Sequence, residues 1–296
     1  MRITCYFMLF LVGLFNNAQS EEWYLENEEK GWTSPEFVRM YFHNSELQSQ
    51  WAWNIIGKAP FRGDESILDF GCGDGKLTAA MSQFVPRGKA LGVDLSAEML
   101  RFAKNKWTTQ TYPNLAFSFA KDLSDDETFD VITSFCVFHL VRNPEELLRQ
   151  LGAKLKPDGR LVILIPGRGR PSLVTAALET GKKYGIEIPF EPENDRFSES
   201  TIFTNTGCKK IMQRAGLTVD WVEEISAPTA FIDQQELITW CQGTIAANWS
   251  IPWEISEAFF TDFVKKLIEI DPVGYQTEEG QILWPCTRIQ AVARQI

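Results

Sequence analysis

An alternation of apolar and amphipathic segments in the first half of the chain limits the folds it can adopt. Five apolar segments typical of buried strands are separated by segments with helical periodicity. The apolar segments, all between residues 66 and 140 or 159 and 166, are "SILDFG", "KALGVDLS", "LAFSFAKDL", "FDVITSFCVFHL" and "GRLVILIP". Continuous apolar strands are typical of parallel strands covered on both faces. Residues 60–166 therefore predict a doubly wound α/β sheet, with its ligand at the carboxyl ends of the strands.

Helices are predicted on both sides of this core. The stretch from Pro35 to Ile56 has helical periodicity, and residues 21–34 are polar enough to be a loose leader. After Pro166 strands and helices no longer alternate regularly. Helices are predicted at "CKKIMQRAGL", "QQELITWCQGTIAANW" and "SEAFFTDFVKKLIEI", and strands at "TVDWVEEI" and "RIQAVARQ". We expect one domain over residues 35–296, with its core at 60–166 and helical additions and the last strands at 167–296.

The charge of the chain restricts its partners. Its 296 residues carry a formal net charge of -10, whereas binding to nucleic acid requires a basic face. We expect no nucleic acid partner. The composition favours small molecules or proteins instead.

The first twenty residues predict a secretory signal peptide. Arg2 precedes an apolar run from Cys5 to Phe15, and small residues precede Glu21. A membrane anchor and a true start at Met8 or later are the alternatives. Without an anchor, no stable membrane association is expected after cleavage. The remaining cysteines show no CxxC pair or metal-type spacing, which suits a reducing compartment and conflicts with export. Localisation therefore stays open between the secretory pathway and the cytoplasm. These cysteines are Cys72, Cys136, Cys208, Cys241 and Cys286.

The segment "ILDFGCGDGK", residues 67–76, joins the first strand to a helix through a glycine-rich loop. Glycines at this place let backbone N–H groups approach a ligand closely. The spacing is G-x-G-x-G, with Lys76 where a dinucleotide-binding fingerprint has its third glycine. Asp69, two residues before the first glycine, suits a cationic ligand better than a pyrophosphate.

D-x-G-x-G-x-G after a strand resembles the first motif of the class I S-adenosylmethionine-dependent methyltransferases. The resemblance implies a mostly parallel, seven-stranded, Rossmann-like sheet with an antiparallel last strand, S-adenosylmethionine as cofactor, S-adenosylhomocysteine as product, and no metal. It implies that Asp69 and the loop hold the amino-acid part, that Asp94 accepts from the ribose hydroxyls, and that Asp122 accepts from the adenine amino group. The cofactor set is completed by Gly71, Cys72, Gly73, Asp74, Gly75, Leu95, Leu123, Ser134 and Phe135. The alternative is that Asp69 and Asp94 only cap helices.

The carboxyl-terminal part resembles the trans-aconitate methyltransferase group, and juvenile hormone acid and malonyl-carrier-protein methyltransferases have a similar layout. All three groups make methyl esters from carboxylates. This chain departs from the group in having His139-Leu140 where His-Trp is common. In that group a W-x-x-G-T segment precedes a helix and a G-x-x-L-x-P-x-x-R run forms the last strand, so the resemblance implies the same here. The matching residues are Trp240, Gly243, Thr244, Gly280, Leu283, Pro285 and Arg288.

The resemblance implies a small-molecule carboxylic acid as partner, handled by a monomer or dimer. A carboxylate is ionised at neutral pH, so the reaction needs orientation rather than a general base. His139 is the candidate that positions the acceptor, with Arg142 and Arg168 as further donors. Tyr41 and Gln48 are expected to close over the ligands, and Trp240 to form a wall. Methylation of a nitrogen or phenol, and a non-catalytic binding protein, are the alternatives.

Overall fold

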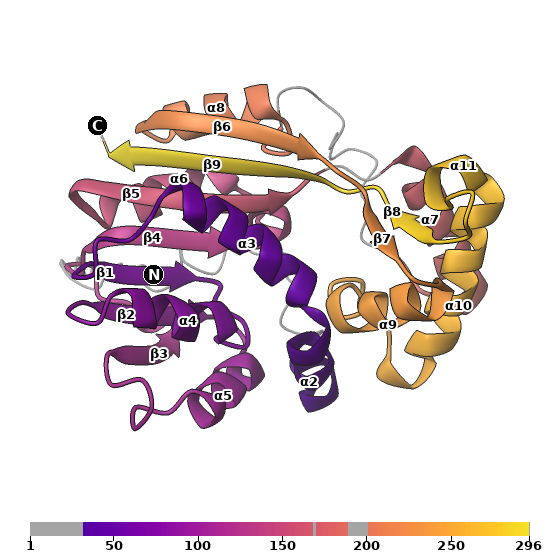
Figure 1. The fold of residues 1–296 in the computed structure, drawn as a ribbon, viewed down its shortest axis with the longest axis horizontal. Coiled ribbons are helices and arrows are strands. Elements are labelled where there is room, and N and C mark those ends of the chain that lie inside the picture. The colour runs from indigo at the N-terminus through magenta and orange to yellow at the C-terminus, as the bar shows by residue number, and fades with distance from the viewer. Residues whose placement is uncertain (1–31, 168–169, 189–200, 296) are drawn as a thin grey trace, which may run out of the picture.

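The structure, a computed structural model, describes residues 32–167, 170–188 and 201–295. The predicted signal peptide, most of the leader and Arg168 lie outside these residues. Seven strands form the main sheet in the order β3-β2-β1-β4-β5-β9-β6 (Figure 1). Their bounds are β1 Ser66–Phe70, β2 Lys89–Asp94, β3 Leu115–Phe119, β4 Phe129–Phe135, β5 Leu155–Pro166, β6 Leu217–Ser226 and β9 Thr287–Gln295.

The strand directions confirm the predicted topology. β1 pairs in parallel with β2 and β4, β2 with β3, and β4 with β5. β9 lies antiparallel between β5 and β6. Asp69 on β1 stands opposite Gly92 on β2 and Thr133 on β4, so the carboxyl ends of the three central strands meet at one edge of the sheet.

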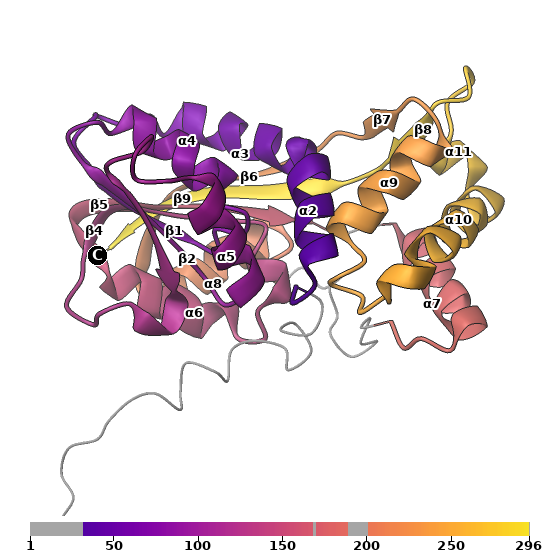
Figure 2. The same cartoon turned by 90° about the horizontal axis from the view of Figure 1, so that it is seen from below.

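Helices cover both faces of the sheet, as continuous apolar strands require. In Figure 2, α3 (Glu46–Lys58) and α4 (Lys76–Phe84) lie on one face, with α6 (Pro144–Ala153) and α8 (Asn205–Arg214) on the other. The core accordingly divides into two clusters of buried side chains. α5 (Ala97–Lys106) packs against β2 and β3, and α2 (Pro35–Asn44) packs against α9.

A second group of elements lies beyond the carboxyl ends of the strands (Figure 1). Trp249 packs against the buried rings of Phe259, Phe260 and Phe263 in this group. We call it the helical lobe. It comprises α7 (Pro171–Tyr184), α9 (Gln234–Thr244), α10 (Trp253–Ile270), α11 (Pro272–Tyr275) and the paired strands β7 (Thr229–Phe231) and β8 (Ile282–Trp284).

Two predicted boundaries were wrong. The helix predicted from Pro35 to Ile56 is divided at Ser45, which caps α3; Asn and Ser side chains compete with the helical backbone for hydrogen bonds, and here Asn44 bonds to the Met40 carbonyl. The segment containing Leu283 and Pro285 does not belong to the last strand. It forms β8 and a break before β9, because proline has no N–H for the ladder.

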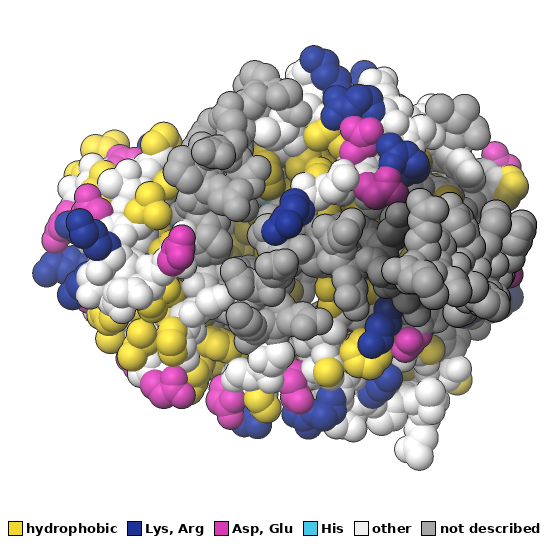
Figure 3. Space-filling model, turned by 180° about the vertical axis from the view of Figure 1, so that it is seen from behind, with side chains coloured by type: hydrophobic (Ala, Val, Ile, Leu, Met, Phe, Trp, Pro, Cys, Tyr) yellow, Lys and Arg dark blue, Asp and Glu magenta, His cyan; other side chains and the backbone are white. Residues whose placement is uncertain are grey.

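The described residues give no support for three other kinds of site. They contain no helix long and apolar enough to cross a bilayer, and no group of three or more His, Cys, Asp or Glu side chains that could hold a metal. The third kind is a nucleic-acid site, which would need a basic face. Figure 3 shows Lys and Arg side chains scattered among acidic ones over the described part of the rear face.

The aromatic core of the helical lobe yields a test of stability. Phe263→Ala removes a fully buried ring that meets Trp249 edge to face at 5.3 Å. We expect the free energy of unfolding to fall by about 3–5 kcal/mol, measured by urea denaturation. Val273→Ala, at a side chain 88% exposed in the same lobe, should change it by less than about 0.5 kcal/mol. Equal losses would contradict this packing.

Candidate functional site

The glycine loop runs from the end of β1 to α4 and is held against β2. The N–H groups of Gly71 and Cys72 donate to the Val93 carbonyl at 2.8 and 3.0 Å. Gly71 and Gly73 have φ angles of 77° and 53°, in the region that favours glycine. A Cβ on Gly71 would lie 2.2 Å from Val137, and one on Gly73 would stand 3.7 Å from the Tyr41 ring. The loop therefore presents bare backbone at Gly73.

Asp94, at the end of β2, connects this loop to the second strand. Its carboxylate accepts from the Gly73 N–H at 2.8 Å and from the Ser96 N–H at 2.9 Å. Burial raises the pKa of Asp94, and the backbone hydrogen bonds counter the rise. The carboxylate has lone pairs left over and lines the pocket, so it is placed to accept from a diol.

Asp69 and Asp74 are more deeply buried beside the loop. The Asp69 carboxylate accepts from the hydroxyls of Thr78 at 2.5 Å and Thr133 at 2.9 Å. Burial raises the pKa of Asp69 to about 6, with Asp94 and Asp74 adding to the rise. One oxygen of Asp74, Oδ2, has no hydrogen-bond partner among the described residues. Both acids border a small cavity of about 30 Å³, which Lys76 also borders with its ammonium 3.9 Å from Asp74 Oδ2. The two carboxylates outnumber this one cation, so the cavity suits a further compact cation such as an ammonium group.

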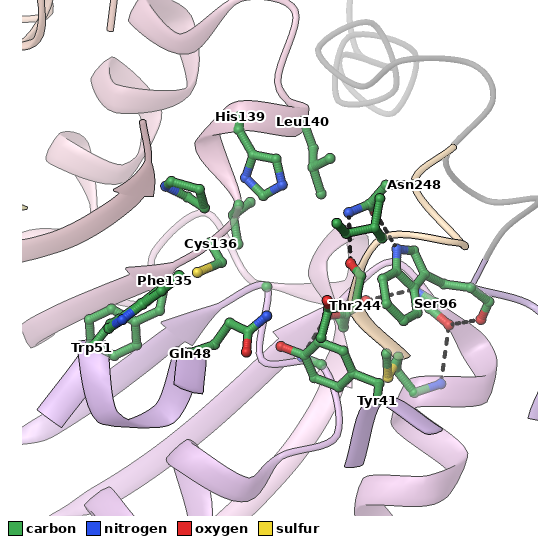
Figure 4. A pocket seen from close by; sticks show the side chains of 18 of the residues that line it. Tyr41, Gln48, Trp51, Ser96, Phe135, Cys136, His139, Leu140, Thr244 and Asn248 are labelled. Atoms are coloured by element: carbon green, nitrogen blue, oxygen red, sulfur yellow. Dashed lines mark hydrogen bonds between the residues drawn. The ribbon is translucent and has the colours of Figure 1, made fainter. Parts of the chain in front are cut away.

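A larger pocket of about 320 Å³ adjoins this cavity, and Tyr41, Gln48, Gly71, Phe135 and Cys136 border both. It extends from the glycine loop to the helical lobe. Figure 4 shows Tyr41 and Gln48 reaching in from α2 and α3, with His139 and Leu140 on the side across from them.

Aromatic side chains form much of the wall on the helical lobe side. The Trp240 ring meets Trp284 at 5.2 Å and Phe231 at 5.7 Å. The indole N–H of Trp240 has no hydrogen-bond partner among the described residues. Asp94 is the only Asp, Glu, Lys or Arg among the described residues of the wall. This part of the pocket therefore suits an apolar body with few polar groups.

The structure brings most of the predicted site residues together. The two cavities are bordered by Asp69, Gly71, Cys72, Gly73, Asp74, Asp94, Leu95 and Phe135 from the cofactor set and by Tyr41, Gln48, His139 and Trp240 from the acceptor set.

Five predicted residues do not border either cavity. Ser134 is buried and donates to the Phe70 carbonyl at 3.0 Å, and Gly75 begins α4 against Phe117. Asp122 and Arg142 are exposed, and Leu123 packs on the core. The adenine contact assigned to Asp122 and Leu123 stays a prediction.

Two residues at the site were assigned no structural role in the sequence analysis. Trp32, in the segment predicted to be a loose leader, lines the pocket; its indole donates to Asn248 at 3.0 Å and its carbonyl accepts from Ser96 at 2.7 Å. Lys76 donates to the Phe42 carbonyl at 2.8 Å and to the Ser45 hydroxyl at 3.1 Å. Lys76 thus fastens the corner between α2 and α3 to the glycine loop.

Comparison with known proteins agrees with this geometry. The family model described as "Methyltransferase domain" matches residues 43–221. The chain is 25% identical to juvenile hormone acid O-methyltransferase of Bombyx mori, over 74% of this chain and 77% of that one. It is also 25% identical to trans-aconitate 2-methyltransferase of Shigella flexneri, over 86% and 96%. The solved structure of coclaurine N-methyltransferase, bound to N-methylheliamine and SAH, shares the fold with a TM-score of 0.51, 15% identity and coverage of 84% and 71%.

The chain belongs to the methyltransferase domain family. It is an S-adenosylmethionine-dependent methyltransferase of the class I fold, with relatives that act on small molecules. The residues fit this cofactor, since the bare backbone at Gly73 and the free lone pairs of Asp94 line the larger pocket and the acids of the small cavity lie in the space that adjoins it.

The position of Asp94 leads to a test of cofactor binding. Asp94→Asn should weaken S-adenosylhomocysteine binding by about tenfold or more in calorimetric titration, because an acceptor with a full charge is lost. The matched control is Asp126→Asn at an exposed residue with no predicted role, which should change the dissociation constant less than about twofold. Asp122→Asn tests the predicted adenine contact separately, and a loss of affinity as large as that of Asp94→Asn would support that contact.

The raised pKa of Asp69 predicts a pH dependence. The pKa of Asp69 is about 6 in the folded protein and 3.8 ordinarily. Between these pH values the folded protein therefore binds more protons than the unfolded chain. As a result Asp69 lowers the free energy of unfolding above pH 6, and this loss disappears as the pH falls. Cofactor binding has the opposite sign, since only the ionised form attracts an ammonium. We expect the S-adenosylhomocysteine affinity to fall as pH drops below about 6. Asp69→Asn should bind more weakly at neutral pH with a shallower dependence, the remainder coming from Asp74 and Asp94. An unchanged profile would contradict the role of Asp69.

Proposed function

We propose that this methyltransferase converts the carboxylate of a small organic acid with an apolar body into its methyl ester. The observation that carries the proposal is the pocket wall, which joins the glycine loop to an aromatic lobe and has Asp94 as its only Asp, Glu, Lys or Arg among the described residues. The names of the relatives from Bombyx mori and Shigella flexneri support an acid as acceptor.

The same wall favours a single carboxylate over several. trans-Aconitate carries three carboxylates, and each would need a donor or a cation once removed from water. The described wall offers few donors to such a molecule, chiefly His139, Gln48, Tyr41 and the indole N–H of Trp240. A monocarboxylic acid with an apolar chain would satisfy these donors and bury its chain against Trp249 and Trp284.

In the proposed reaction the protein orients the acceptor and removes its water. When bound, S-adenosylmethionine would supply a methyl group on its sulfonium sulfur. A carboxylate oxygen would attack the methyl carbon in line, and S-adenosylhomocysteine would leave with the sulfur. Gly73 and Asp94 would hold the cofactor, and Asp69 and Asp74 would attract its ammonium. Tyr41, Gln48 and His139 would direct the acceptor carboxylate, and Trp32, bonded to both Ser96 and Asn248, closes one side of the pocket. Exclusion of water strengthens each of these contacts.

Methylation of a nitrogen or phenol is the second candidate, because His139 lines the pocket and could serve as a base. The two candidates differ in what His139 does. A carboxylate acceptor needs a donor to hold it, so loss of the imidazole should raise KM. A neutral acceptor needs its proton removed, so the loss should lower kcat.

The test is mass spectrometry of carboxylic acids incubated with the enzyme and methyl-labelled S-adenosylmethionine. We expect labelled methyl esters, formed preferentially from apolar monocarboxylic acids. His139→Ala should raise KM for the acid by about tenfold while kcat changes less than about threefold, and His139→Asn, which keeps a donor, should recover part of the loss. A large fall in kcat with unchanged KM would favour base catalysis. Absence of heat on titration with S-adenosylmethionine would indicate a protein that does not bind the cofactor.

A further inference from the structure

Arg288 is a buried cation with no ion-pair partner among the residues that the structure describes. The residue is 7% exposed, and its guanidinium lies over the Trp51 ring at 4.8 Å. Its Nε has no hydrogen-bond partner among the described residues, and no described carboxylate forms an ion pair with it, whereas nearby pairs reach 3.2 Å and less. Buried arginines are ordinarily paired, because an isolated charge out of water is costly.

Arg160 on β5 shows the usual arrangement in the same sheet. Its guanidinium pairs with Glu65 at 3.2 Å and donates to the carbonyls of Ala59 and Pro60 at 3.3 and 2.9 Å. Its side chain is 12% exposed, so Arg160 is largely removed from water although it is less buried than Arg288. Of these two arginines, only Arg288 lacks a described ion-pair partner, so its charge is available to a ligand.

The position of Arg288 puts this charge directly behind the pocket. In the sheet Arg288 is paired with Pro166, which lines the pocket. Trp51 and Cys286, which also lie near Arg288, line the pocket too. The positive charge of Arg288 also acts on the thiols of Cys136 and Cys286 in the pocket wall. Burial raises the pKa of Cys136 and of Cys286, and Arg288 counters the rise at both.

The charges around the pocket are therefore unevenly distributed. The acids Asp69, Asp74 and Asp94 cluster at the glycine loop, where a cationic cofactor is expected. Ser96, bonded to Asp94, and Trp51, which stacks with Arg288, lie at opposite sides of the view in Figure 4. A ligand with a negative group at the Trp51 side would complement this distribution. The apolar wall has a low dielectric constant, so it screens the attraction between Arg288 and that negative group only weakly.

We propose that Arg288 determines specificity for an anionic acceptor, by drawing its carboxylate to the end of the pocket formed by Trp51, Cys136 and Cys286. The inference rests on the proposed function and adds a residue that acts from behind the wall. Arg288 is thus a positioning residue. It selects the charged acid over a neutral molecule of the same shape.

The test compares two probes of equal size, octanoate and octanamide, by calorimetric titration in the presence of S-adenosylhomocysteine. The wild-type protein should bind octanoate about tenfold or more tightly than octanamide. Arg288→Met should abolish that preference while the affinities for octanamide and S-adenosylhomocysteine change less than about twofold. Arg288→Lys, which keeps the charge, should retain part of the preference. Arg160→Met is the matched control. It should lower stability and leave the preference intact.

Three results would overturn the inference. They are a wild-type protein that does not prefer octanoate, an Arg288→Met protein that keeps the preference, and equal losses for both probes, which would mean a purely structural role. If Arg288→Met does not fold, Arg288→Gln takes its place, since it removes the charge and keeps a polar side chain; loss of the preference for octanoate in this variant supports the inference, and an undiminished preference overturns it. Failure of the proposed function is a separate result, namely no methyl ester formed from any carboxylic acid by the wild-type enzyme.

Discussion

The hydrogen bond from the Gly73 N–H to the Asp94 carboxylate holds the site together. It joins the loop after β1 to the end of β2, and both strands end at the same edge of a parallel sheet. With this bond in place, the glycine loop turns its backbone toward the pocket while Asp94 keeps lone pairs for a ligand. Parallel pairing makes such a site possible because it brings the ends of strands from distant parts of the chain together.

The acids beside this bond show how the fold maintains charge in its interior. Asp69 is held by two threonine hydroxyls and Asp74 by the Lys76 N–H, so neither carboxylate depends on a ligand for all its hydrogen bonds. Burial nevertheless raises the pKa of both. A cationic ligand would relieve that cost, which links cofactor binding to the stability of the loop.

The helical lobe gives the site a second, chemically different half. Its rings pack on one another through Trp249 and on the pocket through Trp240 and Trp284. Trp32 connects the two halves through Ser96 on one side and Asn248 on the other. The fold is shared with coclaurine N-methyltransferase, and a shared fold does not fix the acceptor.

The sequence by itself determined the sheet, the glycine loop and the acids at the ends of β1 and β2, because apolar runs, glycine spacing and strand-end acids are local patterns. It did not show that Trp32 reaches the pocket, that Lys76 fastens the corner between α2 and α3, or that Asp122 is exposed. Nor did the motif containing Arg288 show that this arginine is buried with no anionic partner in the described part of the chain. Only the tertiary structure decided these points, since each depends on contacts, or their absence, between segments far apart in the chain.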